Sequence, residues 1–461
     1  MKSFTNRDAK KVEYEYNGVG DVWKMWSPNH ATPFTYAYNA NNQVTSVTNP
    51  NGYTITFAYD GGGRRTRMCR PGSEHQYGYD ARNHLRYATT WKNGGGHIYR
   101  SYYYPHSWDQ TLWDHTGNPL LKNEYFPDSQ YAYNTHLRYD ALYRLIRERV
   151  CDPYGQVVFD VTYTYDQVGN RLSETRDGVT TTYTYDDNDR LTSMTRGGQS
   201  ATFGYDGEGN LLSVSGSLFG SWTLSQSDEN RLQWVTYPSG GGSETDLYWT
   251  SALGQVYRSR LQGSYYRYIY DGNRVLEQTD DSGGTVARYT PESGSYYAPL
   301  LHRRRSDGTS RWPSYDGVGT IRALSDDTGT RTDAYDLDAF GRDLGGTGTT
   351  PNPYRFGGAW GYVTEPSGLL HLGQRFYWPE IGRFIEKDPS RDGMNWYAYA
   401  ANNPVVFIDP EGLWSATVGG YIGIGGEVTF GVNPDGGWFW GVQDISTLPQ
   451  SQRGGVRSRV C

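Results

Sequence analysis

The chain has 461 residues and a net charge of −7, with only 36% hydrophobic residues but 15% aromatic residues, including 42 Tyr and 15 Trp. Disordered chains are poor in aromatic residues, so this composition excludes a largely disordered protein. The acidic balance argues against a nucleic-acid-binding protein, which would need basic stripes. Tyr, Thr, Val and Trp favour strands, and 58 Gly supply turns. We therefore expect an all-β fold whose core is built from tyrosine rings.

Several other classes are excluded by what the chain lacks. Cys69, Cys151 and Cys461 are too few and too scattered for a disulfide framework or a zinc site. The first residues, MKSFTNRDAKK, have no apolar stretch after their charges, so no signal peptide is predicted. The chain contains no run of about 18 or more apolar residues, so no membrane span is predicted. No motif points to a metal or a cofactor, and none is expected.

A unit of about 20 residues repeats along the chain. Three copies follow one another: YTYDQVGNRL at 163–172, YTYDDNDRL at 183–191 and FGYDGEGNLL at 203–212. Their aspartates, Asp166, Asp186 and Asp206, are 20 residues apart. Further Tyr-Asp or Tyr-Asn pairs begin at Tyr38, Tyr59, Tyr79, Tyr139 and Tyr270. The set of eight copies predicts a repeat architecture from residue 38 to residue 271.

Each unit is predicted to form a β-hairpin. Its aromatic residues alternate with polar residues, as in a half-buried strand, and Asp followed by Gly or Asn favours a tight turn. Residues 237–243 (YPSGGGS) and 344–353 are expected to be loops between such units. Because one hairpin cannot bury a face alone, the units must stack side by side. A propeller, a flat solenoid and a sheet that spirals into a barrel all remain open.

The unit resembles the YD repeat of bacterial Rhs proteins, insecticidal toxin-complex C components and animal teneurins. This resemblance implies that the hairpins form a spiralling sheet, and hence a hollow shell that this chain completes wholly or in part. Residues 315–413 resemble the Rhs-associated core, which would plug the shell. The ordered motifs are Gly382-Arg383-Phe384, Asp388-Pro389, Tyr397-Ala398-Tyr399, Asn402-Asn403-Pro404 and Asp409-Pro410-Glu411-Gly412-Leu413. We expect a shell at 1–314, the core at 315–413 and a variable tail at 414–461.

Asp388 and Asp409 are the candidate catalytic residues. For an anonymous Asp-Pro pair the simplest interpretation is a turn, because Asp accepts backbone bonds and Pro fixes φ. Two carboxylates brought together by folding cannot both ionise easily, so one can act as an acid while the other activates water. In the resembled family the two aspartates carry out autoproteolysis after the Leu of Asp-Pro-x-Gly-Leu. Carried onto this sequence, the scissile bond joins Leu413 to Trp414.

Two positions depart from the family's pattern. Lys387 stands where cleaving relatives often have Arg, and it keeps the charge without the planar fork. We include Lys387 with the two aspartates as a candidate catalytic residue. Trp378 stands where the family usually has Asp, which is expected to alter a turn and not the pair of aspartates.

The resemblance implies a shell that encloses its own C-terminal polypeptide, of toxin or effector type, and releases it by self-cleavage. Any enzymatic activity would be a single-turnover aspartic autoproteolysis. The tail itself has no evident nucleophile, base or metal set. Secretion or delivery to a cell surface would use a dedicated export system, with an immunity protein as a further partner. The alternatives are an adhesion module whose aromatic faces bind carbohydrate or protein without proteolysis, and a degenerate fragment with neither role.

Overall fold

The computed structural model describes residues 2–5, 10–81, 83–102, 118–125, 132–251, 254–272, 274–292, 300–391, 393–413, 416–417, 427–432 and 438–443. Its main feature is one sheet of 31 strands. Each strand pairs antiparallel with the strand before it and the strand after it, from β1 and β2 through to β30 and β31. The sheet is therefore a single continuous meander of hairpins.

The first half of the sheet comprises β1 (Lys2–Thr5), β2 (Lys11–Tyr16), β3 (Val22–Trp26), β4 (Phe34–Tyr38), β5 (Val44–Thr48), β6 (Thr54–Tyr59), β7 (Arg65–Arg70), β8 (Ser73–Tyr79), β9 (Leu85–Lys92), β10 (His97–Tyr102), β11 (Leu121–Tyr125), β12 (Ala132–Tyr139), β13 (Leu145–Cys151), β14 (Val157–Tyr165), β15 (Arg171–Arg176) and β16 (Val179–Tyr185). The second half comprises β17 (Leu191–Arg196), β18 (Gln199–Tyr205), β19 (Leu211–Ser215), β20 (Trp222–Gln226), β21 (Leu232–Ser239), β22 (Gly242–Thr250), β23 (Val256–Leu261), β24 (Ser264–Asp271), β25 (Arg274–Asp280), β26 (Thr285–Pro291), β27 (Leu300–Arg305), β28 (Ser310–Tyr315), β29 (Ile321–Ser325), β30 (Arg331–Leu337) and β31 (Asp343–Thr347).

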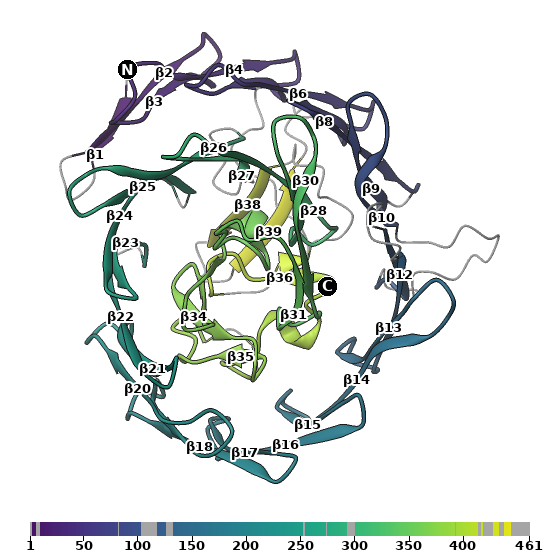
Figure 1. Ribbon diagram of the computed structural model, residues 1–461, viewed down its shortest axis with the longest axis vertical. Coiled ribbons are helices and arrows are strands. Elements are labelled where there is room, and N and C mark those ends of the chain that lie inside the picture. Colours follow the sequence, from purple (N-terminus) through teal and green to yellow (C-terminus); the bar gives the residue numbers. More distant parts are fainter. Residues whose placement is uncertain are drawn as a thin grey trace.

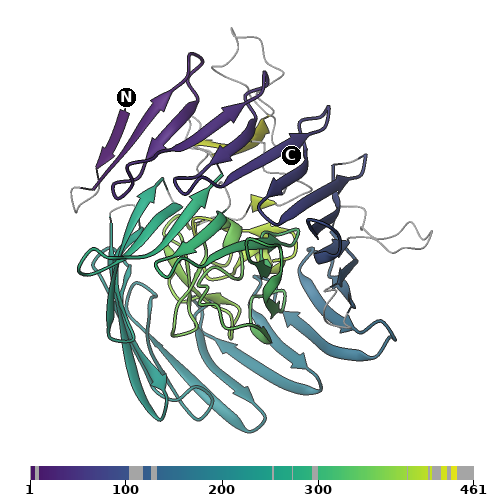
Figure 2. The same ribbon diagram turned by 45° about the horizontal axis from the view of Figure 1, so that its top comes forward.

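The sheet curls into a spiral. Strands β2 to β25 form an outer ring, and β27 to β31 continue inside it (Figure 1). The tilted view shows the hairpins slanting round this ring (Figure 2). The overlapping turns of the spiral are joined by polar contacts: the Tyr14 hydroxyl donates to Asp271 at 2.7 Å, and Arg65 pairs with Glu292. Among the described residues no ladder joins β1 to a later turn, so the sheet spirals and does not close.

The aspartate of each repeat builds the turn that follows it. In the copy at Asp186, the Oδ1 atom accepts the N–H groups of Asn188 and Arg190, both at 3.0 Å. Asp189 takes a positive φ of 60°, and Oδ2 accepts a 2.6 Å bond from the Arg190 guanidinium. The bond to Oδ1 from the N–H of the residue four positions later recurs at Asp60, Asp80, Asp140, Asp152, Asp166, Asp206, Asp280, Asp316, Asp326 and Asp338.

The tyrosine of most Tyr-Asp pairs ties its hairpin to an earlier part of the chain. The Tyr185 hydroxyl donates to the Arg171 carbonyl at 2.8 Å, and the Tyr165 hydroxyl donates to the Leu145 carbonyl at 2.8 Å. The same bond to an earlier strand is made by Tyr38, Tyr59, Tyr79, Tyr139, Tyr270 and Tyr315. The ring supplies buried apolar area and the hydroxyl satisfies a carbonyl, which explains why the core uses Tyr where Phe would leave that carbonyl without this partner.

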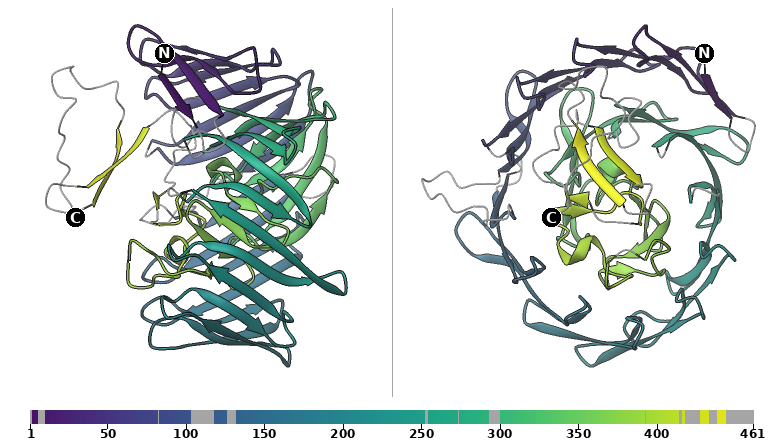
Figure 3. Two further views of the ribbon diagram at one scale, coloured as in Figure 1. Left: turned by 90° about the vertical axis from the view of Figure 1, so that its left-hand side faces the viewer. Right: turned by 180° about the vertical axis from the view of Figure 1, so that it is seen from behind.

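Residues 348–413 form a compact block inside the ring, visible from both ends (Figures 1 and 3). Its short elements are η1 (Gly358–Trp360), β32 (Val363–Thr364), β33 (Leu370–Leu372), β34 (Arg375–Trp378), β35 (Arg383–Phe384), η2 (Ala400–Asn402) and β36 (Phe407–Ile408). The block docks on turns of the sheet: Arg383 donates to the Asp189 carbonyl at 2.6 Å, and Tyr397 donates to the Gly209 carbonyl at 2.7 Å. Trp378 packs on Trp222, with ring centroids 4.7 Å apart, so this departure from the family's pattern serves packing.

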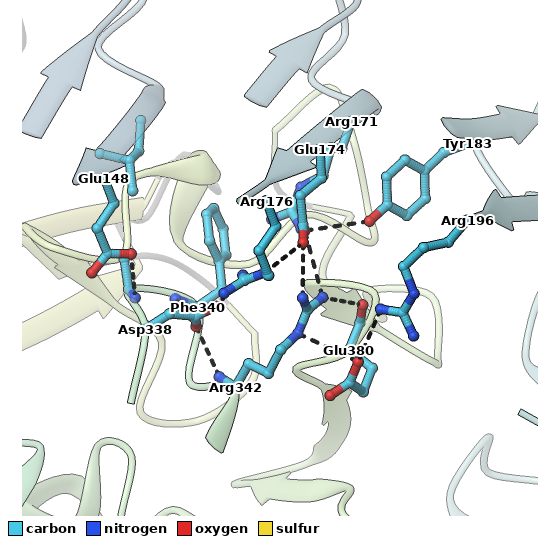
Figure 4. A network of polar contacts seen from close by, with 12 residues as sticks. Glu148, Arg171, Glu174, Arg176, Tyr183, Arg196, Asp338, Phe340, Arg342 and Glu380 are labelled. Carbon is cyan, nitrogen blue, oxygen red and sulfur yellow. Dashed lines mark hydrogen bonds and ion pairs between the residues drawn. The ribbon is translucent and has the colours of Figure 1, made fainter. Parts of the chain in front are cut away.

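A buried network of charges also joins the ring to the inner turn of the spiral (Figure 4). Glu174 on β15 lies within 3.1 Å of Arg171, 3.0 Å of Arg176 and 2.8 Å of Arg342. Burial alone would raise the pKa of Glu174, but the three guanidinium groups lower it to about 2. Arg176 also pairs with Asp338 at 2.6 Å. Since each charge has a partner, the network fixes the inner turn at residues 338–342 against the wall.

The prediction of an all-β sheet of stacked hairpins that spirals into a shell around a C-terminal plug is confirmed. The expected boundary between residues 314 and 315 falls inside β28, and the same sheet continues to β31. The domain division therefore stays a prediction. Beyond Leu413 the described residues form β37 (Ala416–Thr417), which pairs with β36, and a hairpin of β38 (Glu427–Val432) and β39 (Trp438–Gln443). No helix in the described part of the chain is long and apolar enough to cross a membrane.

Candidate functional site

Asp388 and Asp409 each open a turn of the same kind as the repeat turns. The Oδ1 atom of Asp388 accepts the N–H of Ser390 at 2.8 Å, and that of Asp409 accepts the N–H of Leu413 at 2.9 Å. The fourth residue of each turn has a positive φ, 56° at Arg391 and 65° at Gly412. Both aspartates therefore do the structural work that the simplest interpretation of Asp-Pro assigned to them.

The two turns differ from the repeat turns in what meets their Oδ2 atoms. Nη2 of Arg375, the first residue of β34, lies 3.1 Å from Oδ2 of Asp409 and 3.6 Å from Oδ2 of Asp388. The same guanidinium donates to the Trp396 carbonyl at 3.0 Å and to the Gly412 carbonyl. One cation thus brings together two carboxyl groups that are 21 residues apart in the chain.

The three groups are shielded from bulk water. Asp388, Asp409 and Arg375 are 4%, 2% and 3% exposed. Arg375 stacks on Phe384, with its guanidinium carbon 3.6 Å from the ring centroid, which fixes its plane. The N–H of Asp409 donates to the Tyr362 hydroxyl at 2.8 Å. Two acids beside one guanidinium carry a charge of −1 when both are ionised, and protonation of one of them makes the site neutral.

Another buried acid lies next to the site. Glu386 is 1% exposed and accepts the Phe376 N–H at 2.8 Å. Burial raises the pKa of Glu386 to about 8, although Arg375 acts in the opposite direction. Its carboxyl is therefore mostly protonated at neutral pH, so it adds little negative charge next to the two aspartates.

The carbonyl of Leu413 lies beside the acids. The Ser390 hydroxyl oxygen is 2.7 Å from the Leu413 carbonyl oxygen and 2.6 Å from Oδ1 of Asp388. Ser390 is exposed and Leu413 is half-buried, so water can reach this edge of the site. Trp414, the other half of the predicted scissile bond, lies outside the described residues.

Lys387 lies elsewhere around the site. Its ammonium is 4.6 Å from the centroid of the Trp396 ring, and the cation between the two carboxyls is Arg375. The catalytic role of Lys387 stays a prediction. Sequence reasoning missed Arg375 and Ser390. The need of two buried carboxylates for a cation was the one signal available, and it does not say which of the 43 Lys and Arg residues supplies it.

Nothing in the described residues suggests a metal centre, since no group of three or more His, Cys, Asp or Glu side chains is arranged to hold an ion. The arrangement that does exist is a pair of acids, a cation, a hydroxyl and a peptide carbonyl. Such a set can transfer protons to and from a peptide bond and a water molecule.

Comparisons with known proteins agree with the repeat. The RHS Repeat family model matches residues 38–72 and 165–201. The chain is 30% identical over 207 residues to the tRNA nuclease WapA of Bacillus subtilis, covering 42% of this chain and 8% of that protein. It is 46% identical over 63 residues to the toxin protein Tse5 of Pseudomonas aeruginosa, covering 13% of this chain and 5% of that protein.

The chain spans less than a tenth of the length of either relative. Among solved structures, the crystal structure of TcdB2-TccC3-Cdc42 is similar with a TM-score of 0.44 and 17% identity, covering 89% of this chain and 27% of that chain. The repeated hairpins, the family match and the relatives together identify the chain as an Rhs/YD-repeat protein.

Proposed function

We propose that this chain is a shell that encloses a C-terminal polypeptide and releases it by aspartate-dependent self-cleavage between Leu413 and Trp414. The observation that carries the proposal is the Arg375 guanidinium, which lies 3.1 and 3.6 Å from the carboxyl groups of Asp409 and Asp388. The Leu413 carbonyl lies beside the same acids, 2.7 Å from the hydroxyl that also contacts Asp388.

The geometry supports distinct roles for the two acids. Each acid accepts one backbone N–H, but Asp409 lies closer to Arg375, so its ionised form is favoured and it would take a proton from water. Asp388 lies farther from the cation and would supply the acid. The water attacks the Leu413 carbonyl carbon, the C–N bond breaks, and the products are a carboxyl group on Leu413 and an amine on Trp414.

The architecture supports a tail that starts inside the wall. The ring surrounds the block that carries the candidate dyad, so a chain leaving Leu413 starts from inside the wall (Figure 3). The relatives bear the names of a tRNA nuclease and a toxin. By analogy, the enclosed polypeptide of this protein would be an effector, with an export system and an immunity protein as partners.

The test of self-cleavage compares the wild-type chain with Asp388→Asn and Asp409→Asn on a denaturing gel, with N-terminal sequencing of the smaller band. The wild type is expected to lose residues 414–461, which are 48 residues and about 5 kDa at typical composition. Both variants are expected to stay whole, because an amide neither donates an acidic proton nor takes one from water.

Asp186→Asn is the matched control, since Asp186 builds the same turn outside the site. It is expected to be cut like the wild type. A wild-type chain that stays whole, or variants cut as fast as the wild type, would refute the proposal.

The adhesion alternative would rest on exposed aromatic rings. Within the described residues the exposed large aromatic side chains are Tyr16, Trp23, Trp91, Tyr143, Tyr154 and Tyr265, which are spread from β2 to β24. This spread favours processing over a single carbohydrate platform. A folded wild-type chain that is never cut would put the adhesion role first, and an insoluble one would favour a degenerate fragment.

A further inference from the structure

Ser390 makes two contacts that its single hydroxyl proton cannot satisfy alone. Its oxygen lies 2.6 Å from Oδ1 of Asp388 and 2.7 Å from the carbonyl oxygen of Leu413. The carbonyl can only accept a hydrogen bond, and an ionised carboxylate can only accept one as well. The Ser390 hydroxyl therefore bridges the two groups, and it can donate its proton fully to the Leu413 carbonyl when Asp388 is the protonated acid of the proposed pair.

The contact between a turn hydroxyl and the aspartate Oδ1 recurs in other turns of this fold. The contact between the Ser390 hydroxyl and a backbone carbonyl is not part of that turn. Thr328 and Thr309 occupy the same place in the turns that begin at Asp326 and Asp307, and each hydroxyl lies 2.7 Å from the aspartate Oδ1. The backbone carbonyl that meets the Ser390 hydroxyl belongs to Leu413, the residue before the proposed cleavage point. A turn residue of ordinary geometry has thereby been placed between an acid and a reacting carbonyl.

We infer that Ser390 is a catalytic residue that relays a proton from Asp388 to the Leu413 carbonyl oxygen. The inference rests on the proposed self-cleavage. As water attacks the carbonyl carbon, Asp409 takes one proton from that water. The proton of Asp388 passes to the Ser390 oxygen, and the original hydroxyl proton of Ser390 passes to the carbonyl oxygen. A neutral tetrahedral gem-diol results, with Asp388 and Asp409 having exchanged protonation states.

The second half of the reaction runs the relay in reverse. Asp409 gives its proton to the departing peptide nitrogen as the C–N bond breaks. One gem-diol hydroxyl gives its proton to Ser390, whose own proton returns to Asp388, and the carbonyl of a new Leu413 carboxyl forms. One water is consumed, no oxidant or reductant is needed, and both acids regain their starting states. Direct transfer from Asp388 is not required, because the Ser390 hydroxyl contacts both the carboxyl and the carbonyl.

The test follows the rate of cutting during cell-free synthesis of the whole chain by pulse-chase on a denaturing gel. Ser390→Ala is expected to slow cutting by about 100-fold or more, the usual contribution of a positioned proton donor. Ser390→Thr keeps the hydroxyl and is expected to recover the rate to within about tenfold. Thr328→Ala removes the equivalent hydroxyl from a repeat turn and is expected to leave the rate unchanged.

A structural role for Ser390 is separated from the relay by two readouts. In the relay, the protons of Asp388 and Ser390 move in the same step. The wild type should therefore show a larger solvent deuterium isotope effect on cutting than Ser390→Ala, whereas a turn defect would leave the isotope effect unchanged. Equal rates for wild type and Ser390→Ala would overturn the relay and leave the proposed self-cleavage standing. Equally slow Ser390→Ala and Ser390→Thr would also overturn the relay. A wild-type chain that is never cut would overturn both.

Discussion

The repeat turn at Asp186 and the core turns at Asp388 and Asp409 are built alike but have different consequences. In all three, Oδ1 accepts a backbone N–H and the fourth residue has a positive φ. At Asp186 the Oδ2 atom pairs with Arg190 of its own turn, at 2.6 Å. At Asp388 and Asp409 the Oδ2 atoms face Arg375, which belongs to another element.

This difference shows where chemistry enters the fold. A repeat aspartate is neutralised locally and partly in water, so its carboxylate has a partner that moves with it. A core aspartate depends on tertiary packing for its cation, and it shares that cation with a second acid. The same turn therefore serves as a spacer when its partner is local and as half of a reactive pair when its partner is distant. Four substitutions test this contrast.

Arg375→Met is expected to have the largest effect. Removal of the shared cation leaves two buried carboxyl groups without it, which costs about 3–5 kcal/mol of unfolding free energy. Self-cleavage is expected to be lost as well, because the acids are no longer held together. Arg190→Met in the repeat turn removes a half-exposed pair and is expected to cost less than about 1 kcal/mol. Urea denaturation measures both, and equal costs would erase the distinction between the two kinds of turn.

Glu386→Gln tests the buried acid that lies two residues before Asp388. In the repeat, the residue two positions before Asp186 is Thr184, which is exposed. The pKa of Glu386 is raised by burial to about 8, above its ordinary value near 4.3 in an unfolded chain. Between these values the folded state binds the extra proton, so the wild type loses stability as pH rises from about 4.5 to about 8. Gln carries no such proton and escapes this loss.

Across that pH window, the unfolding free energy of the Glu386→Gln variant is therefore expected to rise relative to that of the wild type by roughly 2–4 kcal/mol. Thermal unfolding at a series of pH values gives the difference, and subtraction of the two curves removes the other titrating groups. Glu208→Gln, in an exposed repeat turn, is the control and should follow the wild type. A difference curve that is flat between pH 5 and pH 8 would contradict the burial assigned to Glu386.

The sequence allowed the repeat to be predicted because its information is local. Tyr-Asp spacing, alternation and turn residues each act within about 20 residues, and the hairpins formed as expected. Two local predictions were wrong. Residues 237–243 are strand on both sides of a two-residue turn, not a loop, and residues 344–347 of the second expected loop lie in β31, so only 348–353 are outside a strand. Gly240 and Gly241 have φ of 56° and 86°, and such positive values at both positions suit a tight hairpin turn.

The site was less predictable because it depends on packing between elements. Asp388 and Asp409 came from a family resemblance, and their spacing alone could not place them together. Arg375 reaches Asp409 where the turn of Asp409 packs against β33 and β34, and there the Gln374 N–H donates to the Glu411 carbonyl at 2.8 Å. Ser390 was visible only as a turn residue, since its second partner is 23 residues away.

Gly412→Ala probes that packing. Gly412 has φ of 65°, and a Cβ there would lie 2.4 Å from the Leu372 carbonyl oxygen. Gly155 holds the same position in a repeat turn, with φ of 81° and nothing within 4 Å of a built Cβ. Gly155→Ala is expected to cost about 1 kcal/mol for the left-handed conformation alone, and Gly412→Ala about 2 kcal/mol more for the clash.

Only the Gly412 variant is expected to slow self-cleavage, because the clash moves Leu413 away from Ser390. Urea denaturation and the gel assay measure the two effects separately. Equal stability costs at the two glycines would show that the turn of Asp409 is as free of its surroundings as a repeat turn.

Tyr185→Phe is the smallest change and tests the opposite side of the comparison. The Tyr185 hydroxyl donates to the Arg171 carbonyl at 2.8 Å, the bond that ties one hairpin to the previous one. Its loss is expected to cost about 1 kcal/mol, the net worth of one such bond, while the buried ring stays in place. Cleavage should continue at the wild-type rate, since the repeat wall contributes no group to the reaction. Slower cutting in this variant would mean that the wall and the acids are mechanically coupled, and that the repeat turns are more than spacers.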